Sequence, residues 1–148
     1  MVGIQFFLYE DVPLVQGHIF YPDSPWALTS ISQPQFWRDQ GLFRRRYGDG
    51  SVGGLISVDV SDWDVPGHFV RKPARECSPA EIKHEIWEHL KAALNGEDKT
   101  ILSDDLLHSW HLDDDLVCTP GFATVNGSRL LVHPPGCLLY TSPSPRDS

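Results

Sequence analysis

The chain has 148 residues, of which 41% are hydrophobic and 22% charged, and its formal net charge is −8. This length suits one domain or a piece of a larger one, and the acidic balance disfavours nucleic-acid binding, which requires clustered positive charge. No apolar run approaches the roughly 20 residues that a membrane-spanning helix needs. The three cysteines, Cys77, Cys118 and Cys137, form no close pairs in the sequence, so we expect a reduced, cytoplasmic protein.

Short β-prone segments dominate the first part of the chain. Three of them are separated by proline-containing turns and together predict an antiparallel meander: Gly3–Tyr9, Gly17–Tyr21 and Trp26–Ser32. Gln33–Trp37 predicts a short helical turn that a proline opens. Gly53–Val60 predicts a strand with one buried face, because its apolar and polar residues alternate.

The strongest local signal is a helix over Ser78–Leu94. Ser78 and Glu81 predict a capping box, and Pro79 suits the first helical position. The predicted apolar stripe comprises Ile82, Ile86, Trp87, Leu90, Ala93 and Leu94, while Lys83, Glu85, Glu88 and Lys91 lie on other faces. Leu106–Leu112 and Ser128–His133 are further predicted strands. The pattern predicts an α+β fold, an antiparallel sheet with one long amphipathic helix.

His108 and His111 are candidate metal ligands, because acidic residues lie close to them in the sequence. The alternative is an ordinary acidic loop beside an edge strand, and we favour it because residues three apart on a strand point to opposite faces. The nearby acidic residues are Asp104, Asp105 and Asp113–Asp115. We therefore predict no metal site.

Other catalytic patterns have little support. No Gly-x-Ser-x-Gly elbow is present, and Gly48-Asp49-Gly50 lacks the third glycine of a dinucleotide-binding turn. Cys77 precedes the predicted helix, where a thiolate would be favoured, but without a placed partner we expect a buried small residue. The five tryptophans indicate core packing for most of them, with lining of an apolar pocket as the alternative for the rest.

The last twelve residues, Cys137–Ser148, have no periodicity and contain two Ser-Pro steps. Their back-translation matches a transposon-end sequencing adapter over eleven residues. We therefore expect residues 137–148 to be a non-native, disordered tail and Gly136 to be the last natural residue. Met1 is the only methionine and precedes a strand without any lead-in, so we expect the natural part to be a fragment.

The order of the remaining segments resembles a known family. The markers are Ser24–Ser32 followed by Phe36-Trp37, the Gly53–Trp63 strand before the capped helix, Leu107–His111, and Leu130–Gly136. This series resembles the C-terminal half of FAD-dependent amine-oxidase-like oxidoreductases. Within these it is similar to the phytoene desaturase and hydroxysqualene dehydroxylase branch.

The resemblance implies that residues 1–136 are part of a substrate domain whose FAD domain is missing from the chain. The parent enzyme would act on a lipophilic, isoprenoid-like substrate, its FAD would perform hydride chemistry, and peripheral membrane contact would be compatible with such a substrate. Neither flavin-binding motif of the family falls on this chain, so we expect the chain alone to bind no FAD and to be inactive. We assign no catalytic residue. Trp26, Phe36 and Trp37 are candidate apolar lining of the substrate pocket. The alternative function is a non-enzymatic α+β module that binds a ligand or a protein.

Overall fold

A computed structural model describes residues 2–12, 14–36, 44–45 and 48–113. Their regular elements are five strands and one long helix, with short 3-10 turns at Pro34–Phe36, Ala74–Glu76 and Asp104–Leu106. The tail prediction for 137–148, the predicted strand Ser128–His133 and the Leu130–Gly136 marker lie outside the described residues. The strands and the helix are β1 (Val2–Leu8), β2 (His18–Phe20), β3 (Leu28–Ser32), β4 (Gly54–Val60), α2 (Pro79–Leu94) and β5 (Leu107–Leu112).

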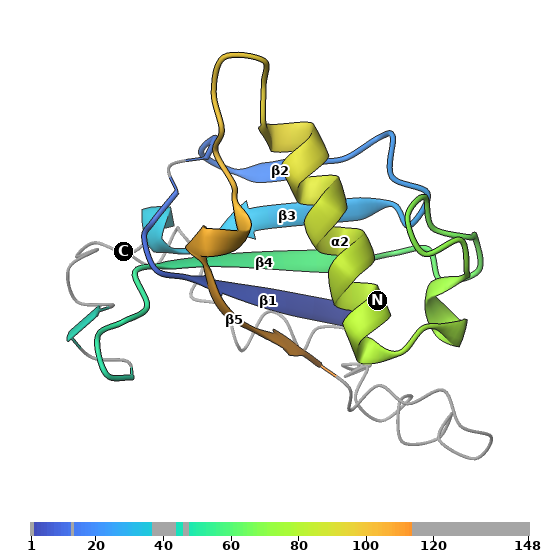
Figure 1. Cartoon of the computed structure of the whole chain (residues 1–148), viewed down its shortest axis with the longest axis horizontal. Coiled ribbons are helices and arrows are strands. Elements are labelled where there is room, and N and C mark those ends of the chain that lie inside the picture. Colours follow the sequence, from blue (N-terminus) through green and yellow to red (C-terminus); the bar gives the residue numbers. More distant parts are fainter. Residues whose placement is uncertain (1, 13, 37–43, 46–47, 114–148) are drawn as a thin grey trace, which may run out of the picture. The chain divides into compact units, whose positions relative to one another are not determined.

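The strands form one antiparallel sheet in the order β2-β3-β4-β1-β5 (Figure 1). The predicted meander of the first three strands is therefore wrong, because β1 pairs with β4 and β5 and not with β2. The burial of the strands explains this order. Ile4, Phe6 and Leu8 of β1 are fully buried, whereas β2 is three residues long and its Phe20 is 63% exposed. The most apolar strand takes an inner position, and the short strand takes an edge.

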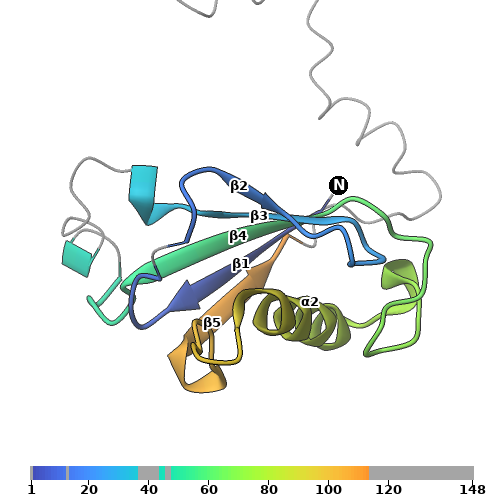
Figure 2. The same ribbon diagram turned by 90° about the horizontal axis from the view of Figure 1, so that it is seen from above.

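Helix α2 packs on one face of this sheet (Figure 2). Side chains of a strand alternate between faces, and the face toward the helix carries Phe6, whose ring lies 5.0 Å from the ring of Trp87. On α2 the buried apolar residues are Ile82, Ile86, Trp87 and Leu90, which confirms this part of the predicted stripe. Ala93 is exposed instead. The α+β architecture with one long amphipathic helix is thus as predicted.

The ends of α2 are fixed by side chains. At the start, Ser78 Oγ accepts from the Glu81 backbone N–H and Glu81 accepts from the Ser78 N–H, so the capping box is confirmed. At the other end, the Asn95 carboxamide oxygen accepts from the N–H groups of Ile101 and Leu102, and its Nδ2 donates to the Leu102 carbonyl. Asn95 therefore fastens the loop that leads toward β5.

In the described part of the chain, no helix combines the length and the apolar character that crossing a bilayer requires.

Candidate ligand-binding groove

A groove of about 420 Å³ lies between the end of β2 and the C-terminal half of α2. Figure 1 shows α2 crossing the sheet so that its C-terminal end (yellow) reaches β2 (blue). The volume falls in the range of about 300–1,000 Å³ that is usual for ligand pockets. The lining residues are Ile19, Phe20, Tyr21, Pro22, Asp23 and Ser24 from the strand side, and His89, Ala92, Ala93 and Leu94 from the helix.

Two consecutive turns shape the strand side of the groove. The Ser24 N–H donates to the Tyr21 carbonyl, and the Ala27 N–H donates to the Ser24 carbonyl. The Trp26 side chain between them is fully buried, and its indole N–H donates to the Val65 carbonyl at 3.0 Å. The turn that carries Asp23 and Ser24 is thereby held against the loop after β4.

Ser24 is a buried polar residue of this wall. It is 7% exposed, and its Oγ has no hydrogen-bond partner among the described residues. The neighbouring Tyr21 hydroxyl is satisfied, since it lies 2.8 Å from Ser30 Oγ. A buried hydroxyl without a partner is uncommon, because it loses its bonds to water without replacement. Ser24 also lines the groove, so this hydroxyl without a partner lies just beneath the groove surface.

Below the helix side of the groove, Glu85 of α2 is fully buried. The sequence pattern places Glu85 outside the apolar stripe of α2, yet its side chain is not exposed to solvent. Its carboxylate accepts three successive backbone N–H groups: His68 at 2.6 Å, and Phe69 and Val70 at 2.8 Å each. A Cβ added to Gly67 would lie 2.5 Å from the Glu85 carboxyl carbon, so the loop backbone approaches the carboxylate as closely as only glycine allows.

His89 lies one turn after Glu85 and lines the groove. Its ring is 5.2 Å from the His68 ring and 5.3 Å from the Phe69 ring, between centroids. The Nε2 atom lies 3.2 Å from Glu85 Oε1, but it is not aligned for a hydrogen bond and has no other partner among the described residues. Burial lowers the pKa of His89, and His68 adds to this shift, although Glu85 opposes it. A neutral imidazole thus faces the groove at neutral pH.

Neither Trp26 nor Phe36, two of the three predicted pocket residues, lines this groove. Trp26 lies in the core behind the turn, and Phe36 is 53% exposed at the end of the 3-10 turn after β3. Trp37 lies outside the described residues. Their role as substrate lining stays a prediction.

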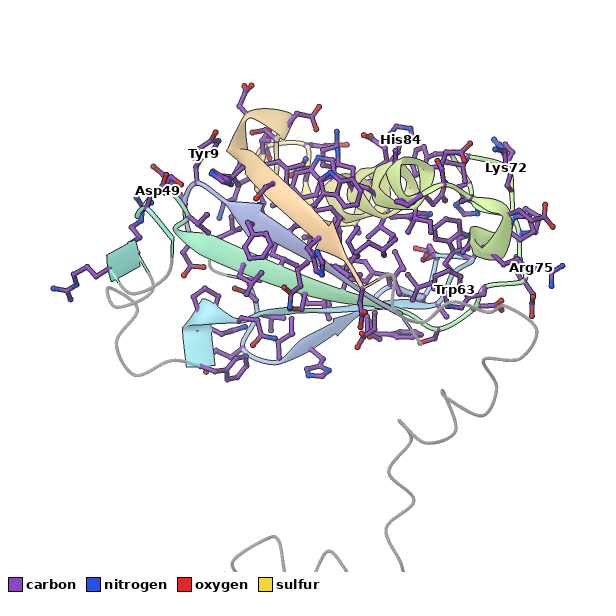
Figure 3. All side chains as sticks on the ribbon, turned by 90° about the horizontal axis from the view of Figure 1, so that it is seen from below. Tyr9, Asp49, Trp63, Lys72, Arg75 and His84 are labelled. Atoms are coloured by element: carbon purple, nitrogen blue, oxygen red, sulfur yellow. The ribbon has the colours of Figure 1, made fainter. Side chains whose placement is uncertain are left out.

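His108 and His111 both lie on β5. Because Phe7 pairs with Ser109 and Leu8 with Leu107, the register shifts at His108, and simple alternation does not relate the two histidines. His108 Nε2 is 3.1 Å from Ser51 Oγ, and its Nδ1 is 2.8 Å from Ser109 Oγ. No metal-binding group of three or more ligand residues is present in the described part of the chain. Figure 3 shows this exposed end of the sheet at Tyr9 and Asp49, away from the end marked by Trp63 and Arg75.

Cys77 is half-buried and directly precedes the helix cap. Burial raises the pKa of its thiol, and the Sγ lies 3.3 Å from the Pro73 carbonyl, to which it donates. These features are those of a protonated structural thiol rather than a reactive thiolate.

Searches of protein-family models, of curated proteins and of solved structures found no match to this chain. The groove and its buried polar groups are therefore the main structural guide to function. Sequence analysis missed Ser24 and His89, because neither shows a spacing that marks a site. The one available signal was a serine in a Pro-Asp-Ser-Pro turn, and that signal points only to a turn.

Proposed function

We propose that this chain is part of the substrate domain of an FAD-dependent oxidoreductase that acts on a lipophilic, isoprenoid-like substrate. The observation that supports this proposal is the architecture, an antiparallel sheet with a helix across one face, which is the layout that the family resemblance implies for a substrate domain. Figure 2 shows no described helix of comparable length on the other face. That face carries half-buried Phe7 and Ile31 beside the exposed polar residues Gln5 and Asp59, and the two apolar side chains would contact the substrate.

The described residues do not fit FAD itself. A flavin dinucleotide is held where a glycine-rich turn joins a strand to a helix and leaves backbone N–H groups free for the pyrophosphate. The N-terminus of α2 instead follows a Ser-Pro step, and its capping box occupies the N–H groups of Ser78 and Glu81. The proposal therefore assigns FAD to a domain outside these residues, and it assigns no catalytic step to this chain. A cytoplasmic location and contact with a membrane surface through the substrate belong to the same proposal.

Sequencing the genomic DNA on both sides of the coding region tests this proposal. We expect an in-frame strand–turn–helix with Gly-x-Gly-x-x-Gly on the 5′ side. The protein expressed from the extended frame should be yellow with the visible absorbance of oxidised flavin, and the 148-residue chain should be colourless. A short gene that lacks this motif, or a colourless extended protein, would refute the flavoenzyme.

The groove favours a second candidate, a non-enzymatic module that binds a ligand or a protein. Its support is the coincidence of a concave surface with a buried hydroxyl that has no hydrogen-bond partner among the described residues, Ser24 Oγ. A short gene would agree with this candidate and disagree with the flavoenzyme, so the same DNA sequence separates the two.

A further inference from the structure

The groove adjoins an open edge of the sheet. In the described part of the chain, β2 pairs only with β3. The Tyr21 N–H donates to the Leu28 carbonyl, so the Tyr21 backbone faces β3. Because these directions alternate along an antiparallel strand, Ile19 also faces β3, whereas the N–H and C=O groups of His18 and Phe20 face the open edge.

This edge has few of the features that usually prevent pairing with another chain. Edge strands are commonly protected by charged residues, prolines or bulges. The sequence of β2, His-Ile-Phe, contains no proline and no residue with a fixed charge, and its register with β3 is regular. Only its shortness limits pairing. An added strand would therefore find free backbone donors and acceptors beside the groove.

The walls of the groove restrict the side chains of such a strand. Ile19, Ala92, Ala93 and Leu94 form apolar surface, and Asp23 is the one lining residue with a carboxylate. No lysine or arginine is among the lining residues. The last turn of α2 carries partial negative charge as well, so apolar side chains and one cationic side chain complement the surface.

We propose that the groove binds an extended peptide segment of another protein, which adds to β2 as a further antiparallel strand. Its backbone pairs with His18 and Phe20, apolar side chains pack on the last turn of α2, and a lysine or arginine meets Asp23. A lipid lacks the alternating donors and acceptors that the edge requires, whereas strand addition supplies them. The inference rests on the second candidate function, that of a binding module.

Two pairs of variants of the full 148-residue chain test this inference. Phe20→Pro removes the outward N–H at an edge position where proline is tolerated. Its control Phe20→Ala removes the same groove-lining side chain but keeps that N–H, so the difference between the two variants isolates the N–H. Ala93→Trp fills the groove at an exposed helix position, and its control Ala80→Trp alters an exposed position in the first turn of α2. Circular dichroism establishes that each variant is folded, and the Ala93 pair remains informative if Phe20→Pro is not.

The probe is a phage-displayed library of random heptapeptides, selected on the wild-type chain. We expect enriched sequences that contain apolar residues and a lysine or arginine. Their synthetic versions should bind at least tenfold more weakly to Phe20→Pro than to Phe20→Ala, and at least tenfold more weakly to Ala93→Trp than to Ala80→Trp, which should bind them like the wild-type chain. In the wild-type chain, they should shift the backbone amide resonances of Phe20 and Ala93.

Four results would overturn the inference. The first is a selection on the wild-type chain that enriches only peptides also enriched in a parallel selection on Ala93→Trp. The second is peptide binding that Phe20→Pro and Ala93→Trp both leave intact. The third is a concentration-dependent dimer that Phe20→Pro abolishes, which would make a second copy of this chain the occupant. Farnesol binding in the groove without any peptide binding would also exclude the peptide but leave a ligand-binding module standing. The flavoenzyme proposal is tested separately by the colour of the extended protein.

Discussion

Replacing Glu85 with glutamine should loosen the loop that this carboxylate holds. Glutamine has nearly the same volume, so no cavity forms, but it carries one oxygen and one NH₂ group instead of two oxygens. The remaining oxygen can accept from Phe69 and Val70, whose N–H groups both donate to Oε2 in the wild type. The NH₂ group then opposes the N–H of His68. Hydrogen bonds to charged groups contribute about 1.5–3 kcal/mol each, and a buried donor without an acceptor costs about 1–3 kcal/mol.

We therefore expect Glu85→Gln to lower the free energy of unfolding by about 2–5 kcal/mol in urea denaturation. Hydrogen exchange should accelerate first at the amides of His68, Phe69 and Val70. Glu88→Gln is the matched control, because Glu88 lies on the same helix, is partly exposed and pairs with Lys91. Such a surface pair contributes at most about 1 kcal/mol. If Glu85→Gln cost no more than Glu88→Gln and left the three amides protected, the carboxylate would not hold the loop.

Further variants test the helix, its surface charge and the groove. Ser78→Ala should destabilise the fold by about 1 kcal/mol because the helix loses its cap. Ile86→Ala, at a fully buried position, should destabilise it by about 2–5 kcal/mol. Urea denaturation measures both changes, and an Ile86→Ala variant as stable as the wild type would contradict the burial of Ile86. Hydrogen bonds from Lys72 and Ser78 lower the pKa of Glu81 from 4.5 to about 2, so its contribution to stability is present above pH 4.5 and is lost as the pH falls through about 2. Glu81→Gln should flatten the acid-unfolding curve over that interval, and an unchanged curve would refute the assignment. Ser24→Ala should leave stability unchanged or raise it by up to about 1 kcal/mol in thermal unfolding, because it removes a buried hydroxyl without a partner; a clear loss would mean that the hydroxyl is already bonded.

Local patterns predicted α2 well because its determinants are close together in the sequence. Ser78 and Glu81 are three residues apart, and the spacing of Ile82, Ile86 and Leu90 matches the turn of a helix. Glu85 shows the limit of this reasoning, since its partners are the backbone N–H groups of residues 68–70, which side-chain patterns do not reveal.

Strand order and the groove depend on contacts between distant segments. Alternating residues identified the strands, but alternation does not say which strand lies beside which. The groove forms only where the turn at Ser24 meets the end of α2, and its buried polar atoms become recognisable once both sides are in place. The apolar lining predicted at Trp26 illustrates the same difficulty, because a tryptophan in a core and one in a pocket have the same sequence signature.

The inner position of β1 also determines when the fold can form during synthesis. β1 leaves the ribosome before the other described strands, yet its neighbours are β4 and β5, and Ile4 pairs with Val58 and Leu112. The apolar residues of β1 are therefore fully covered only after most of the described chain has been synthesised, and strand pairings so distant in sequence form slowly. β1 has neither partner until β4 (Gly54–Val60) is synthesised, and one of its edges stays unpaired until β5 (Leu107–Leu112) follows. The nascent chain thus passes through a stage in which premature association competes with folding, and shielding of β1 by a chaperone would act at this stage.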